Sequence, residues 1–367
     1  MACADLGYEV LSGPVMEMVL ARAGRHPGGA LAAAQIELTA TMSAIEGFRV
    51  ILAKLFLGVE GHWEGAAEGR DPAFVHGLRV ATRRSRSLLN EGATVLPRGV
   101  LATAKAGLAQ LGTCTGPARD LDVYLAEWDS YLELLEPDLA GALQPVEQLL
   151  EQRRDAAYAT LAEGLASAPM RSFTRDWNRW LRKPMPRRTL TRSPDCEREL
   201  APFIKECIER AHVTLLENGR LINDASPSTE LHDLRRDAKR LRYLFECFAG
   251  VLPSKASKKF VRRLKALQDN LGAHQDAEVH AAMLVALVQE PDAQSLSTET
   301  LAAVEALAEQ LRQQCHLARA EFATRFAEYD SPATQIGIAR ILIFEAGADE
   351  LAAERLPATP DRRREGP

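Results

Sequence analysis

The sequence predicts an all-α fold with two similar halves that resemble four-helix bundles, and three observations lead to this prediction. Ala, Leu, Glu and Arg dominate long stretches in which apolar residues recur at helical spacing. Alternating β-branched segments are missing, and aromatic residues make up only 6% of the chain, which argues against sheets. The third observation is an internal repeat, which predicts an approximate twofold axis between the halves.

Helices are expected in two sets, and Pro or Gly marks most of the joints between them. The first set covers residues 36–62, 72–92, 98–112, 118–134 and 138–165, and the second covers 195–221, 228–249, 254–271, 274–290 and 298–328. We therefore divide the chain into an N-terminal extension (1–35), a first bundle (36–182), a Pro/Arg-rich linker (183–194), a second bundle (195–330), and a C-terminal helix with a disordered basic tail (331–367).

The repeat aligns residues 75–123 with residues 231–279 at a constant shift of 156 positions and without a gap. It pairs His76 with His232, and it also pairs Leu96-Pro97 with Leu252-Pro253. Two unrelated helices rich in Ala and Leu share many positions by chance, but not Pro, Gly and His together. We interpret the repeat as an internal duplication.

Each copy contains one helix with an apolar face and an opposite cationic face. Leu78, Leu88 and Leu89 belong to the apolar face of the first copy, and Leu234 and Leu241 to that of the second. The first stripe consists of His76, Arg79, Arg83 and Arg86, flanked by Arg84, and the second stripe consists of His232, Arg235, Lys239 and Arg242, flanked by Arg236 and Arg240.

A solvated helix face is the ordinary explanation for such charges, but residues 75–90 contain no carboxylate to pair with them. Like charges on one helix repel each other, and both copies keep this unfavourable pattern. A polyanion would neutralise it, because Arg supplies forked donors to phosphate oxygens and a protonated His adds a directional N–H. The stripes therefore predict an anion-binding surface on a chain whose net charge is −5.

Two further groups of charged residues accompany the stripes. The next helix of the second copy carries Lys258, Arg262 and Lys265 on one side, and these cations would extend the second stripe. The end of each copy carries acids, namely Asp120 and Asp122 in the first and Asp276 and Glu278 in the second. Capping of a helix first turn explains these acids, and orientation of the Arg side chains is the alternative.

Cofactors and metals are not expected. His274, Glu278 and His280 look like metal ligands, but no fourth ligand has a convincing spacing and the first copy has no equivalents. Glycine-rich phosphate loops, serine elbows and HExxH motifs are missing. The six cysteines form no CxxC pair, no signal peptide is recognised, and no segment suits a membrane span, so a cytoplasmic protein is expected.

The pattern His-x-x-Arg-x-x-x-Arg-Arg-x-Arg, then Leu-Pro, then Arg-Asp-Leu-Asp-Val resembles the CHAD family (conserved histidine α-helical domain). The segments 231–243 and 267–272 carry the resemblance most closely. It implies that the basic helices meet at a central groove or pore and bind inorganic polyphosphate, and in several members it implies association with polyphosphate granules. The implied ligands are His76, Arg79, Arg83, Arg84, Arg86, His232, Arg235, Lys239, Arg240 and Arg242.

We therefore expect a non-enzymatic polyphosphate-binding protein whose site would also accept sulfate or phosphate. One alternative is a histidine phosphotransfer protein that uses His76 or His232, although Val80 and Arg236 stand where that class has a small residue. The other alternative is a nucleic-acid-binding module. The stripes lack the interleaved aromatic residues that stack bases and the Asn or Gln side chains that read base edges, so nucleic acid is the weaker candidate.

Overall fold

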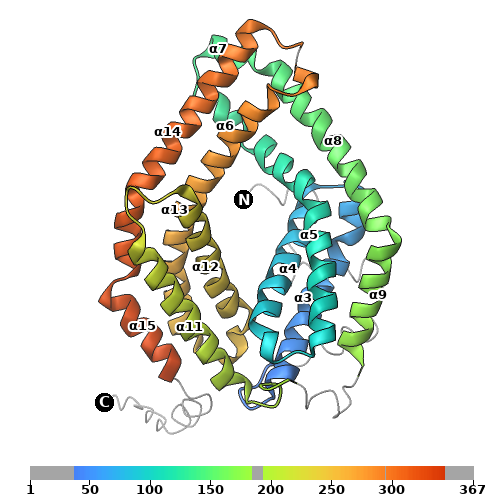
Figure 1. The fold of residues 1–367 in the computed structure, drawn as a ribbon, viewed down its shortest axis with the longest axis vertical. Helices are drawn as coiled ribbons and strands as arrows, with labels where there is room; N and C mark the ends of the chain where they lie inside the picture. The colour runs from blue at the N-terminus through green and yellow to red at the C-terminus, as the bar shows by residue number, and fades with distance from the viewer. Residues whose placement is uncertain (1–36, 184–192, 294, 344–367) are drawn as a thin grey trace, which may run out of the picture.

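The computed structural model describes residues 37–183, 193–293 and 295–343. Within these ranges every secondary-structure element longer than a single bridge is a helix. The all-α prediction is confirmed, with one isolated β-bridge joining Ser43 to Glu199. Figure 1 shows the helices arranged as a ring. The first-half helices are α3 (Ala44–Ala67), α4 (Pro72–Glu91), α5 (Arg98–Ala126), α6 (Trp128–Leu132), α7 (Pro137–Ala142), α8 (Gln144–Ala166) and α9 (Ala168–Arg182).

The second-half helices start after the linker. They are α11 (Leu200–Leu221), α12 (Ser228–Cys247), α13 (Ser254–Leu287), α14 (Thr298–Tyr329) and α15 (Pro332–Ile343). The N-terminal extension, most of the linker and the basic tail lie outside the described residues. None of the described helices is both long enough and apolar enough to cross a membrane.

Two expected breaks between helices are wrong. Helix α5 continues through Gly116-Pro117, between the expected helices 98–112 and 118–134, and α13 continues through Gly272, between the expected helices 254–271 and 274–290. A proline inside a helix costs about 3 kcal/mol relative to alanine. Packing on both sides of Pro117 offsets this cost, since Leu111 and Ala118 are both buried in the same core. The acids that follow these joints therefore lie in helix interiors, and their expected role as first-turn caps is wrong.

Other helix boundaries also differ from the expected ranges. The range 138–165 contains two helices, which meet at Leu143, and the helix expected from residue 195 begins at Leu200. Helix α9 was not expected. Its N-terminus is capped by Ser167, whose side chain accepts a hydrogen bond from the Met170 backbone N–H, and its sequence buries Phe173 and Trp177.

Two hydrophobic clusters hold the helices together, and each contains residues from both halves. The larger cluster joins Phe48 and Leu78 of the first half to Leu234 and Phe248 of the second. The smaller cluster joins α5, α6 and α8 to α13 and α14, with Trp128 buried in it. The halves therefore share both cores, and the division into two bundles by duplication stays a prediction.

The two stripe helices present the faces that the sequence predicts. On α4 and α12 the apolar residues Leu78, Leu89, Leu234 and Leu241 are buried. Helix α4 begins with Asp71 as its N-cap, which accepts a hydrogen bond from the Ala73 N–H at 2.7 Å, and with Pro at its first position. With the apolar faces in the core, the stripes lie on the sides of α4 and α12 that the core leaves uncovered.

Candidate anion-binding site

Helix α4 lies beside α12, and polar contacts between them hold the two stripes in register (Figure 1). Arg83 Nε of the first stripe donates a hydrogen bond to the Tyr243 hydroxyl at 2.7 Å. Arg84 Nη2 donates to Glu246 Oε2 at 2.6 Å. These contacts join residues that are 160 and 162 positions apart in the chain. The stripes therefore belong to neighbouring helices rather than to remote surfaces.

Lys239 lies near cations of both stripes. Burial and the nearby guanidinium groups of Arg235 and Arg83 lower the pKa of Lys239 to about 8. Arg235 belongs to the same stripe as Lys239, whereas Arg83 belongs to the other stripe. Cations of both copies therefore lie close enough to repel one another, which is the condition under which a polyanion would bind favourably.

Arg79 in the first stripe lies across the surface of α5. Its Nη1 donates a hydrogen bond to the Gly112 carbonyl oxygen at 3.1 Å, and its Nη2 lies 3.7 Å from Asp120 Oδ1. A Cβ atom at Gly116 would lie 3.4 Å from Nη1, so the guanidinium lies close to the helix backbone at this position. Gly116 thus lies beneath Arg79 rather than at a helix end.

Arg235 in the second stripe lies across α13 in the equivalent way. Its Nη1 donates to Gln275 Oε1 at 2.6 Å, and its Nη2 donates to Asp276 Oδ1 at 3.2 Å. A Cβ atom at Gly272 would lie 3.7 Å from Nη2. Asp120 and Asp276 therefore contact the stripes as the orienting role predicts, and each holds an Arg at an equivalent position of the repeat.

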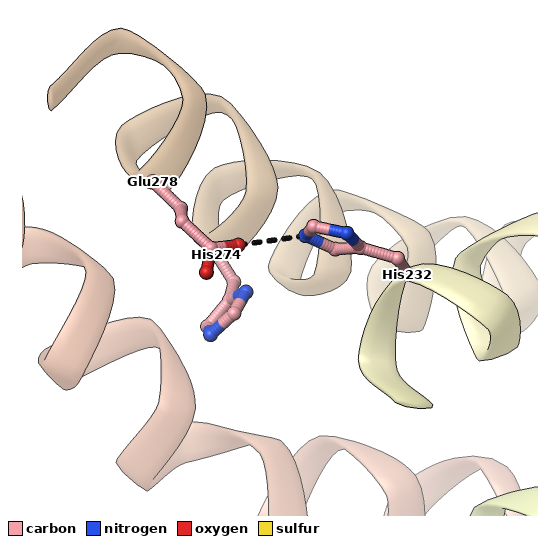
Figure 2. A group of neighbouring side chains, drawn as sticks. All are labelled: His232, His274 and Glu278. Atoms are coloured by element: carbon pink, nitrogen blue, oxygen red, sulfur yellow. Dashed lines mark ion pairs between the residues drawn. The ribbon is translucent and has the colours of Figure 1, made fainter. Parts of the chain in front are cut away.

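The two histidines of the stripes have different surroundings. His76 is largely exposed. Its pKa is lowered by partial burial of the ring and by the nearby groups of Arg119, Arg83 and His62. His232 instead lies 2.7 Å from Glu278, measured from Nε2 to Oε2 (Figure 2). Arg119 on α5 is a further cation of the site that the sequence analysis passed over, although its place directly before Asp120 was a signal for it.

Further predicted ligands also form ion pairs with carboxylates. Arg240 forms an ion pair with Glu91 across the helix interface, and its Nη2 lies 3.0 Å from Glu91 Oε2. Arg84 pairs with Glu246, and the exposed Arg236 pairs with Asp233. The first two pairs connect α4 to α12. Arg84 and Arg240 therefore form part of the interface between the stripe helices, and the anion-binding role of these two residues and of Arg236 stays a prediction.

Other predicted residues lie elsewhere. Asp122 is buried and accepts a hydrogen bond from the Tyr158 hydroxyl of α8 at 2.8 Å, so it contacts α8 instead of a stripe. Lys258 and Arg262 line a surface cavity of about 650 Å³ between α12 and α13. Lys265 is exposed on α13.

The three residues that resemble metal ligands in the sequence, His274, Glu278 and His280, do not form one cluster in the structure. The Nδ1 atom of His280 lies 2.5 Å from the Tyr131 hydroxyl, in the smaller core, and His280 does not join His274 and Glu278. His232 of α12 takes that place, as Figure 2 shows. A sequence pattern could not reveal this group, because His232 comes from another helix and lies 42 positions before His274.

The fold and the site together describe an all-helical protein in which two cationic stripes lie on neighbouring helices. The chain belongs to the CHAD domain family, whose model matches residues 50–285, and this confirms the resemblance found in the sequence. A solved CHAD domain from the plant Ricinus communis is similar, with a TM-score of 0.61 and 26% identity, covering 83% of this chain and 94% of that one.

A second solved structure shares the fold. It is PptA from Streptomyces chartreusis, with a TM-score of 0.58 and 18% identity, covering 77% of this chain and 99% of that chain. No curated protein matches the chain.

Proposed function

We propose that this protein binds inorganic polyphosphate in the region where the two stripes converge, and that it does so without catalysis. The observation that carries the proposal is the crowding of Arg83, Arg235 and Lys239, which lowers the pKa of Lys239 to about 8. Membership of the CHAD family supports the same ligand through the resemblance described above.

Binding follows from charge and hydrogen bonding. The exposed side chains of His76, Arg83 and Arg86 and the half-exposed ones of Arg235 and Lys239 offer donors to successive phosphate groups. Charge-assisted hydrogen bonds of this kind are about twice as strong as neutral ones. The release of counterions from the polymer adds a term that weakens as salt rises, by analogy with nucleic acids.

The same donors would accept single sulfate or phosphate ions, but a long polymer engages many of them at once and therefore binds more tightly. Association with polyphosphate granules in the cytoplasm would follow directly from this preference for the polymer. Nucleic acids offer phosphate oxygens to the same Arg side chains, but their bases would find few stacking partners in this site.

Retention on immobilised polyphosphate during a salt gradient tests the proposal. We expect the Arg83→Glu, Lys239→Glu double variant to elute at far lower salt than the parent, with affinity reduced at least 100-fold. The slope of log affinity against log salt should fall by about 2, because two phosphate contacts are lost.

The control variant is Arg312→Glu with Arg325→Glu, which makes the same change in net charge at partly exposed positions of α14. It should elute near the parent. Equal elution of both double variants, or displacement of polyphosphate by DNA or RNA at equal salt, would contradict the proposal. An acid-labile phosphohistidine formed with a phosphodonor would favour phosphotransfer instead.

A further inference from the structure

His232, His274 and Glu278 form a compact group where α12 crosses α13 (Figure 2). Each of them brings one potential ligand atom, and these atoms all lie within 4.8 Å of one another. His274 and Glu278 are four residues apart on α13, so their side chains emerge from the same face of that helix. His232 reaches the group from α12, and the group therefore joins two helices.

One member of this group is a buried polar group without a partner among the described residues. The His274 side chain is 3% exposed, and its Nδ1 atom has no hydrogen-bond partner. An unsatisfied buried nitrogen costs about 1–3 kcal/mol, so its retention here points to a ligand.

The contact between His232 and Glu278 also fits an ion. Their atoms lie 2.7 Å apart, yet neither atom has a hydrogen bond of acceptable geometry among the described residues. Ligand atoms around a tetrahedral ion with bonds of about 2.0–2.1 Å lie about 3.3–3.5 Å apart. A movement of less than about 1 Å in these partly exposed side chains would therefore create the ligand spacing.

We propose that His232, His274 and Glu278 bind one divalent transition-metal ion of the zinc class, with a fourth position left for water or an anion. Two imidazoles and one carboxylate are a ligand set for Zn²⁺ and its neighbours, whereas Mg²⁺ and Ca²⁺ prefer oxygen alone. The side chains of His232 and Glu278 are about one third exposed, which leaves the open position accessible to solvent.

The surrounding charges permit a cation. Arg319 of α14 is a permanently charged group that acts on His274. Arg319 is turned toward the backbone, since its Nη2 donates to the carbonyl oxygens of Asn223 and Ser226 at 2.7 Å each. The carboxylate of Glu278 supplies the one negative charge among the three ligands.

The site belongs to the second copy alone. At the shift of 156 positions, Ala118 stands in the first copy where His274 stands in the second. The equivalent of Glu278 is Asp122, which is hydrogen-bonded to Tyr158 instead. The protein therefore binds a single ion per chain, and this ion joins α12 to α13 on one side of the molecule.

Titration of the full chain with Co²⁺, followed by displacement with Zn²⁺, tests this site in the absence of polyphosphate. We expect one Co²⁺ per chain, with the visible absorption of a tetrahedral or five-coordinate ion. Glu278→Gln, at a partly exposed position, should lower the affinity at least tenfold. His274→Asn should lower it more than 100-fold, since even residues that only support a ligand contribute 10–100-fold.

Thermal unfolding gives a second readout. Zn²⁺ should raise the Tm of the parent and of the control His280→Asn, whose histidine lies on the same helix outside the group. The rise should be smaller for Glu278→Gln and smallest for His274→Asn. The proposal is overturned if the parent binds no Co²⁺, or if both ligand variants bind it like the parent. A thiolate charge-transfer band from Cys315 would also overturn this ligand set.

Discussion

Lys239 is the cation of the candidate site whose protonation is most sensitive to its neighbours, because its pKa lies near 8. Below that pH it is already charged in the free protein, and a polyanion finds it ready to bind. Above that pH each binding event must take up a proton. We expect the Kd for polyphosphate to rise by up to about tenfold per pH unit above pH 8, as measured by titration between pH 7.5 and 9.5.

Lys239→Arg provides the comparison for this effect, because a guanidinium stays charged throughout that pH range. Its affinity should be almost independent of pH over the same interval. A parent protein whose affinity is equally flat would show that Lys239 does not contact the polymer.

Arg240 and Glu91 make a different kind of contribution, because Glu91 is almost completely buried while Arg240 is about one third exposed. Arg240→Met would leave a buried carboxylate without its cation. We expect the free energy of unfolding to fall by about 2–3 kcal/mol in urea titrations, less than for a fully buried pair. The double variant Glu91→Leu with Arg240→Met should recover most of this loss, and failure to recover it would mean that packing dominates.

At the scale of the helices, amphipathic patterns predicted the stripe helices and their buried faces correctly. The patterns failed at Gly116-Pro117 and Gly272, where local rules for helix ends were overruled by packing. Arg79 and Arg235 lie beside these glycines, but a Cβ atom at either position would make only an ordinary contact, at 3.4 and 3.7 Å. A sequence pattern does not distinguish a glycine that ends a helix from one through which the helix continues.

Gly107 lies where α5 packs against α9, and its lack of a side chain allows close contact between these helices. A Cβ atom at Gly107 would lie 2.2 Å from the ring of Phe173, so Gly107→Ala must displace that ring. We expect a loss of about 1–3 kcal/mol in stability, measured by chemical unfolding. Gly99→Ala on the same helix is the control. Its Cβ would have no neighbour within 4 Å, and we expect it to stabilise the helix by about 0.5–1 kcal/mol.

For the whole molecule, the family resemblance implied that the two basic helices meet, but the sequence did not show how they are joined. The charge pattern and the repeat indicated the stripes, but not the acids on other helices that pair with several of their Arg side chains. The pairs Arg240–Glu91 and Arg83–Tyr243 join residues 149 and 160 positions apart, and no local pattern connects such positions. The metal-like group was missed for the same reason.

The shared cores make a prediction about the intact molecule. Because both hydrophobic clusters contain residues of both halves, a cut between the halves should not separate them. We expect a chain carrying a protease site within residues 184–192 to elute as one species in gel filtration after cleavage, and to keep its affinity for polyphosphate. Separation of the fragments under native conditions would show that the halves are independent.

The two cores also determine how an incoming polymer is received. Since the stripe helices are fixed by packing before any ligand arrives, little conformational entropy remains to be lost when phosphates bind. The rate of association should then depend on electrostatic attraction over long distances, and ionic strength would control how fast the protein captures a chain as well as how long it holds it.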